Sequence, residues 1–283
     1  MPFSPRYGGQ PVIDIDAVVT DPYEAFARQR GRLAETLAGL NTAEWNSPSR
    51  CGGWTVQDVI EHLVGVNRFF AVSLESGLRN QPTRLLASFD PVAVPAAMVD
   101  AARGAPTPDT LDRFVTTNDA LADLLGGLSG ADWSTPAEAP PGHLAARAVV
   151  AHALWDSWIH ERDVLVPLSR VQEIETDEVS TSLVYVAALG PGLSCAAGST
   201  KTGTLAVVAH DPAIGFSVDI GHEATVRAGA GAGAGAGHRA TATIEGDAVG
   251  LLEALSYRSP MLAMDRRHRW LLGGLGHVFG QDT

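Results

Sequence analysis

The sequence has few cysteines and little positive charge, and each scarcity excludes a class of protein. Its only two cysteines, Cys51 and Cys195, lie far apart in the chain, so a close-spaced metal pair or a disulfide framework is excluded. We expect both thiols to be reduced. Lys and Arg number 20 against 32 Asp and Glu, which gives a formal net charge of -12. Nucleic acid is therefore not an expected partner, because clustered cations would be needed to neutralise its phosphates.

Long apolar runs and targeting signals are also scarce. The apolar runs fall short of the roughly 18 to 20 residues that a membrane span requires, and the N-terminal MPFSPRYGGQ lacks the basic and apolar regions of an export signal. Hydrophobic residues make up 45% and charged residues 18%, values typical of a globular protein. We therefore expect a cytoplasmic monomer or homodimer with no membrane partner. Its 283 residues are enough for two domains.

Helical periodicity runs through the first 165 residues. In residues 21–40, side chains recur at three- and four-residue steps in a register that contains Tyr23, Phe26, Arg30, Leu33 and Leu37. In GWTVQDVIEHLVGV, Thr55 and Asp58 have the spacing of a capping box, which predicts a helix start. Further helices are expected over 110–126 and in LAARAVVAHALWDSWIHERDVLV, with proline-rich segments between them. About four helices with irregular links indicate an up-and-down bundle.

Beyond Pro167 the pattern changes to a mixture of helix and strand. A helix is expected over 175–188 and another in GDAVGLLEALSYRSP, while strands are expected in GTLAVVAH, FSVDI, EATVRA and HRATATIEG. The run Ala228–Gly237 between the last two strands contains only Ala and Gly, and we expect a mobile hairpin loop there. A glycine-rich phosphate cradle is disfavoured, since it needs a strand, a tight turn and a helix N-terminus in that order.

A small group of polar residues interrupts the helical patterns. His62 stands among valines and a leucine, and Asp156 and His160 have i, i+4 spacing, which puts both on one helix face. These donors suit Zn²⁺ or a neighbouring first-row metal, and three protein ligands leave a position for water or substrate. His152, one turn earlier, is a minor option for a fourth ligand or a partner of a ligand. The alternative is that the histidines are hydrogen-bonded core residues and that Asp156 and His160 pair at the surface.

Two segments resemble the mycothiol-dependent maleylpyruvate isomerase family, which lies within the DinB-like metal-binding superfamily. PSRCGGWTVQDVIEHLVGV is similar to the family's first signature, and DSWIHERDV is similar to its second, in which Glu-x-x-x-His precedes an Asp. The resemblance implies that His62, Asp156 and His160 bind a divalent metal, usually zinc, in a four-helix bundle. It also implies that mycothiol serves as the thiol. Asp156 replaces the family's usual Glu, so its shorter arm must lie closer to the metal.

The resemblance extends at lower detail to the C-terminal region. TIEGDAVGLLEALSYRSP is similar to the end of the family's sterol-carrier-like domain, which commonly closes on a Gly-Arg pair. Tyr257 replaces the glycine and Arg258 matches the arginine, to which the resemblance assigns the binding of an acidic substrate or the thiol. A plain surface arginine is the alternative. Asp163 is expected to orient the His160 ring by accepting its other N–H, and Cys51 is expected to pack in a loop rather than act as a nucleophile.

The expected fold class is α+β, with a DinB-like four-helix bundle over residues 1–168 and a smaller sterol-carrier-like domain over residues 169–283. The expected function is that of a metal-dependent enzyme that uses mycothiol, because a metal-bound thiol is deprotonated and nucleophilic. Either cis–trans isomerisation of a small unsaturated acid or S-transfer to an electrophile would follow. Two alternatives stay open: a metal-dependent hydrolase or lyase that needs no thiol, and a non-catalytic protein that binds a small apolar ligand.

Overall fold

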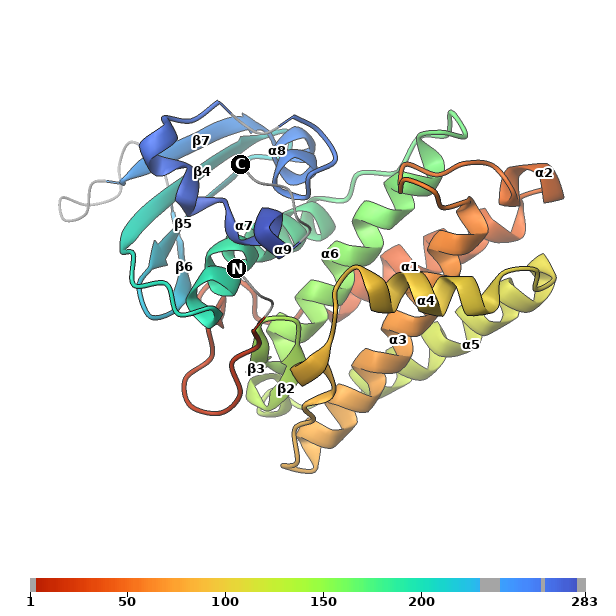
Figure 1. Ribbon diagram of the computed structural model, residues 1–283, viewed down its shortest axis with the longest axis horizontal. Coiled ribbons are helices and arrows are strands. Elements are labelled where there is room, and N and C mark those ends of the chain that lie inside the picture. Colours follow the sequence, from red (N-terminus) through yellow and green to blue (C-terminus); the bar gives the residue numbers. More distant parts are fainter. Residues whose placement is uncertain (1–3, 230–239, 261–262, 279–283) are drawn as a thin grey trace.

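The computed structural model describes residues 4–229, 240–260 and 263–278, which form a helical part and a sheet-containing part (Figure 1). The long helices of the helical part are α1 (Tyr23–Ala38), α3 (Val56–Leu78), α5 (Thr107–Gly126) and α6 (Ala146–Leu165). Helix α3 packs against α5 and α6, and α1 packs against the same two helices. The four helices therefore pack side by side around the interior of the helical part. Shorter elements connect them: α2 (Thr42–Trp45), η1 (Leu85–Ser88), α4 (Ala93–Ala102) and η2 (Asp132–Ser134).

The start of α3 confirms the capping box predicted from the sequence. The Thr55 hydroxyl accepts a hydrogen bond from the Asp58 backbone N–H at 3.2 Å, and Asp58 Oδ2 accepts one from the Thr55 N–H at 2.9 Å. Two of the unpaired N–H groups of the first turn are thus satisfied. This local signal fixes where α3 begins and therefore where His62 lies along it.

The proline-rich segments contain more regular structure than the sequence predicted. The hairpin of β2 (Pro136–Ala139) and β3 (Gly142–Ala145) forms in a segment expected to be a loop. Buried Glu138 ties this hairpin to distant segments, because its carboxylate accepts hydrogen bonds from Tyr7, Thr83, Leu85 and Leu86. Helix α4 accommodates Pro95 in its first turn, where the missing N–H has no intrahelical partner to lose.

The sheet contains five described strands in the order β1-β6-β5-β4-β7. They are β1 (Ile13–Asp14), β4 (Gly203–His210), β5 (Ile214–Ile220), β6 (Ala224–Ala228) and β7 (Ala242–Asp247). Strands β4, β5 and β6 run antiparallel, while β7 joins β4 and β1 joins β6 in parallel. Because β5 and β4 separate β6 from β7, the predicted hairpin between them is wrong. Residues 230–239, which include most of the Ala/Gly run, lie outside the described residues.

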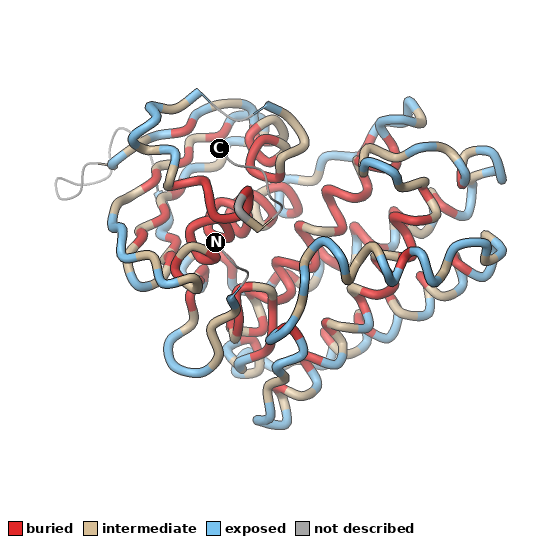
Figure 2. The backbone as a smooth tube through the Cα atoms, viewed as in Figure 1, coloured by how far each residue is buried: buried red, intermediate tan, exposed pale blue. Residues whose placement is uncertain are grey.

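Helix α7 (Thr176–Ala196) lies between the sheet and the helical part. It packs against α1 and α6, against β5 and β6, and against α8 (Ala248–Leu255) and α9 (Gly274–Val278), while η3 (Arg266–Leu271) also contacts it. It continues past the predicted end at residue 188 and contains Pro191. Helix α7 is long and apolar enough to cross a membrane, which the sequence analysis did not predict. However, 78% of its most apolar 18-residue stretch is buried inside the structure (Figure 2). Such burial is typical of a core helix.

Candidate metal centre

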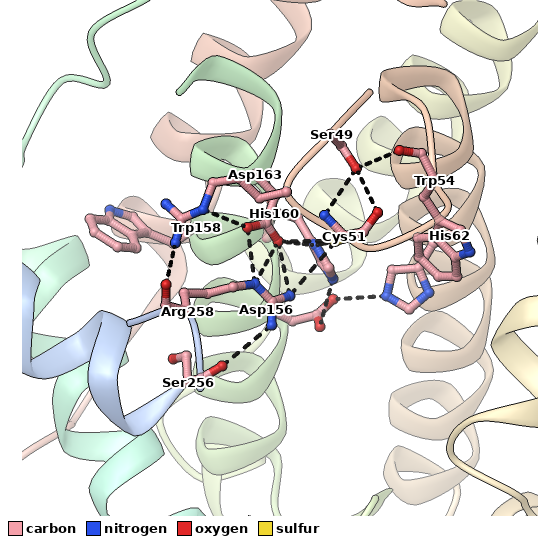
Figure 3. Close-up of polar contacts among 12 residues, drawn as sticks. Ser49, Cys51, Trp54, His62, Asp156, Trp158, His160, Asp163, Ser256 and Arg258 are labelled. Carbon is pink, nitrogen blue, oxygen red and sulfur yellow. Dashed lines mark hydrogen bonds and ion pairs between the residues drawn. The ribbon is translucent and has the colours of Figure 1, made fainter. Parts of the chain in front are cut away.

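The structure brings His62, Asp156 and His160 together between α3 and α6 (Figure 3). His62 Nε2 lies 3.7 Å from Asp156 Oδ2, and His160 Nε2 lies 3.6 Å from Asp156 Oδ1. One donor atom from each residue lies within 4.8 Å of the other two. The shorter arm of Asp156 therefore reaches both histidines, and the three donors are close enough to share one ion.

The chemistry of these residues fits a divalent metal. Two imidazoles and a carboxylate are ligands that Zn²⁺ takes in proteins. Asp156 Oδ2 is buried and has no hydrogen-bond partner among the described residues. A buried carboxylate oxygen without a partner is destabilising, and a bound cation would satisfy it.

Charges inside the cluster shift the protonation of its members. Burial lowers the pKa of His160, but Asp156, Cys51 and Asp163 outweigh burial and raise that pKa to about 10. Burial raises the pKa of Asp156, yet His160 and His62 hold it well below its ordinary range. In the metal-free protein, His160 is therefore an imidazolium beside a carboxylate, and a metal must displace its proton to bind.

Asp163 occupies the far side of the His160 ring, as the sequence predicted. Asp163 Oδ2 lies 3.0 Å from His160 Nδ1, which leaves Nε2 on the side of Asp156. Arg258 Nε donates to both carboxylate oxygens of Asp163, at 2.9 and 3.0 Å. Burial raises the pKa of Asp163, but His160 and Arg258 hold it well below its usual value. Arg258 thus reaches the centre through Asp163 rather than by contact with the three clustered donors.

The residue before Arg258 has a backbone conformation that favours glycine. Tyr257 has φ of 57°, in the left-handed region that glycine adopts without steric strain. Here a tyrosine takes that conformation and still directs the next residue toward Asp163. With Tyr257 at this position, Arg258 bonds both carboxylate oxygens of Asp163.

Cys51 lies closer to the centre than the sequence indicated. Its thiol donates to Asp163 Oδ2 at 3.2 Å, and Sγ lies 3.6 Å from His160 Nδ1 and 3.7 Å from Arg258 Nη2. Cys51, His160 and Asp163 form a second group of donors, but the Arg258 guanidinium already neutralises its carboxylate. The signal for this position was its place in the same signature segment as His62.

Sequence reasoning also missed a clamp that holds the C-terminal segment on the helical part. Glu253 Oε1 of α8 accepts hydrogen bonds from Arg50 at 2.6 Å and from Arg162 at 2.7 Å. Arg50 also donates to the Arg258 carbonyl at 3.1 Å. These bonds connect the signature loop, α6 and α8, and they position the turn that carries Arg258.

His152 lies outside the group of clustered donors. Its Nδ1 lies 2.7 Å from the Tyr185 hydroxyl, and the rings of Phe70, Trp155 and Tyr185 surround it. Burial lowers the pKa of His152 to about 4, so the ring is neutral. It packs among these rings as a hydrogen-bonded aromatic residue.

Comparison with known proteins places this geometry in a family. Residues 26–165 match the family model of the mycothiol maleylpyruvate isomerase N-terminal domain. Two uncharacterized proteins of Mycobacterium tuberculosis, from strains CDC 1551 / Oshkosh and ATCC 25618 / H37Rv, are each 34% identical over 88 residues, or 30% of this chain. The chain spans about half the length of these curated relatives, 47% of each.

Solved structures extend the likeness to the sheet-containing part. The crystal structure of the mycothiol-dependent maleylpyruvate isomerase has a TM-score of 0.57 at 14% identity, and that of its histidine-to-alanine mutant has 0.56 at 15% identity. Each comparison covers 84% of this chain and 88% of the other. At such identities the likeness shows a shared α+β fold. The matched segment, which runs from α1 to the end of α6, contains all three clustered donors, and through it the chain belongs to the mycothiol maleylpyruvate isomerase family.

Proposed function

We propose that this protein is a metal-dependent enzyme that uses mycothiol as its thiol cofactor or co-substrate. His62, Asp156 and His160 would hold a divalent metal, with zinc as the expected ion. The observation that carries the proposal is the convergence of their donor atoms within 4.8 Å, in a segment of this family. The proposed reaction is cis–trans isomerisation of a small unsaturated acid. S-transfer to an electrophile begins with the same thiol attack and differs in that the thiol stays attached.

The chain's own residues have distinct proposed tasks in this chemistry. A divalent metal, when bound, lowers the pKa of a coordinated thiol so that the nucleophilic thiolate forms near neutral pH. Asp163 keeps the His160 ring oriented by accepting its Nδ1–H. Arg258, whose side chain is 26% exposed, would hold an anionic group of the substrate or the thiol. Trp54, 5.5 Å from the His62 ring, would form a wall of the site.

The proposal also extends to the architecture. We infer that α1, α3, α5 and α6 are the DinB-like four-helix bundle of a domain over residues 1–168. Residues 169–283 are proposed to form a sterol-carrier-like domain, with β1 contributed by the N-terminal segment. Support comes from the pairwise packing of the four helices and from the separate sheet.

A ligand substitution tests the metal assignment directly. We expect His160→Ala to lose the bound metal in elemental analysis of the untagged protein, while its helical circular dichroism stays near the wild-type level. His210→Ala is the matched control, because His210 is exposed on β4 and far from α6 in sequence. Full metal occupancy in His160→Ala would rule out the ligand set.

Thiol dependence separates the proposed reaction from its rivals. Metal-containing protein whose turnover requires mycothiol supports the proposal. Metal-dependent turnover without thiol would instead identify a hydrolase or lyase. A metal-free protein from metal-replete cells would favour a non-catalytic binding protein.

A further inference from the structure

A layer of buried polar side chains interrupts the apolar core of the helical part. The buried apolar side chains form two separate clusters. On α1, α3 and α5 the change from one cluster to the other coincides with a polar residue: Arg30, Asn67 and Asn118, which are 2%, 0% and 6% exposed. We call these three residues the polar layer. On α6, Asp156 of the metal centre lies close enough for its charge to act on Arg30.

The polar layer holds several atoms that have no partner. Asn67 Nδ2 donates to Asn118 Oδ1 at 2.6 Å, but Asn67 Oδ1 and Asn118 Nδ2 have no hydrogen-bond partner among the described residues. The same is true of Arg30 Nε and Nη1. Buried polar atoms without partners are rare in native proteins. Three of the free atoms in the layer, Arg30 Nε, Arg30 Nη1 and Asn118 Nδ2, are donors, which points to a ligand with acceptor oxygens.

Arg30 is the charged member of the layer. Its Nη2 donates to the Ala153 carbonyl at 3.3 Å, so the guanidinium lies against α6 one turn before Asp156. It also lies 5.0 Å above the Phe26 ring. No carboxylate of the described residues bonds it. Burial lowers the pKa of Arg30 to about 10, although the charges of Asp156 and Glu161 oppose this shift. A buried cation with one hydrogen bond and no directly bonded carboxylate destabilises the folded protein.

We propose that the polar layer recognises a carboxylate group of a small organic anion. Arg30 would supply the charge, through N–H groups whose geometry suits a carboxylate, and the free Asn118 Nδ2 would donate a hydrogen bond to the same group. The inference rests on the proposed function, because the layer adjoins Asp156 and would set the acid beside the metal centre. This carboxylate site is separate from the anion site proposed at Arg258, because Arg258 is paired with Asp163 and forms no hydrogen bond or ion pair with the polar layer in the described residues.

The experiment is calorimetric titration with maleate, pyruvate and inorganic phosphate, on both zinc-loaded and metal-free protein. We expect wild type to bind at least one of the two carboxylates more tightly than phosphate. Arg30→Met, of similar length and uncharged, should bind that carboxylate about tenfold or more weakly, as the loss of charge-assisted hydrogen bonds implies. Arg79→Met, on an exposed side chain after α3, should bind it like wild type.

Thermal stability gives a second readout. Because Arg30→Met removes a buried charge with no carboxylate partner, its melting temperature should rise without ligand. A lower melting temperature would show that the surrounding residues stabilise the buried charge of Arg30. Where Arg30→Met does not fold, Asn118→Leu provides the test, and it should also weaken carboxylate binding.

Several outcomes would overturn the inference: no binding of either carboxylate to wild type, preference for phosphate, or unchanged binding in the folded polar-layer variants. Failure of the proposed function is distinguishable from these. A protein that takes up no metal refutes the metal centre, whereas loss of carboxylate binding in metal-free Arg30→Met still supports the polar layer.

Discussion

Asp163 influences the candidate metal centre without being one of its proposed ligands. Its carboxylate accepts from His160 Nδ1 and is itself held by Arg258. Removal of such a partner typically lowers metal affinity by about 10- to 100-fold. We therefore expect Asp163→Asn to bind zinc more weakly by that factor, measured by competition with a chelator. Asp100→Asn, at an exposed position of α4, is the control. Equal affinity in the two variants would mean that packing alone orients the ring.

The same scale shows what the sequence could predict about single residues. The signature spacing identified His62, Asp156 and His160, and the structure places their donors together. Arg30 stood in the apolar register of residues 21–40, which correctly predicted a buried face. Its lack of a carboxylate partner was not predictable, because its surroundings come from α6, more than a hundred residues away. The contacts of Cys51 with His160 and Asp163 were not predictable for the same reason.

At the scale of elements, Glu253 determines how α8 docks on the helical part. It receives hydrogen bonds from both Arg50 and Arg162. Glu253→Gln removes the carboxylate that Arg50 and Arg162 share and leaves Arg162 without an ion-pair partner among the described residues, so the free energy of unfolding should fall by about 1–2 kcal/mol. Urea denaturation measures the change.

Glu245→Gln on β7 is the matched control for this clamp, because Glu245 pairs with His210 at the surface. An exposed pair of this kind contributes little to stability. If both glutamine variants unfold at the same urea concentration as wild type, the clamp does not stabilise the docked arrangement.

Elements with local signals were predicted, and elements formed by tertiary contacts were not. The capping box of Thr55 and Asp58 is encoded within four residues and was found. The β2–β3 hairpin contains Glu138, whose carboxylate has partners in two distant segments, at Tyr7 and in residues 83–86. Helix α7 continues through Pro191 because both sides of it are buried. Periodicity within one segment does not report such contacts.

At the scale of the whole molecule, the order of the strands was beyond the sequence pattern. The pattern identified β4, β5 and β6, and most of β7, but β6 and β7 were assumed to be neighbours because they are consecutive. In the structure β7 pairs with β4, and residues 13–14 extend the other side of the sheet. Strand order depends on what covers the sheet, and here α7 and α8 pack against it.

The dependence of folding stability on pH is also a property of the whole molecule, and His152 shapes its acid side. Burial lowers the pKa of His152 from 6.5 to about 4. Between these values the unfolded chain binds a proton that the folded protein does not. This contribution to stability is therefore present above 6.5 and is lost as the pH falls toward 4, by about 1.4 kcal/mol per pH unit. His160 contributes to stability in a different pH range. Its pKa is raised to about 10, so its contribution is fully present below pH 6.5 and is lost as the pH rises through 10.

His152→Asn tests this assignment in metal-free protein. In wild type, the free energy of unfolding from urea denaturation should fall with acidification between about pH 6.5 and 4.5. In the variant, this fall should be smaller by about 1.4 kcal/mol per pH unit, the contribution of one proton. Only the difference in slope matters, since the loss of the Tyr185 hydrogen bond shifts the whole curve of the variant downward. The lowered pKa values of Asp156 and Asp163 keep these carboxylates ionised throughout the interval. Parallel curves would show that His152 titrates in the folded protein as it does in the unfolded chain, and that its surroundings admit the charge.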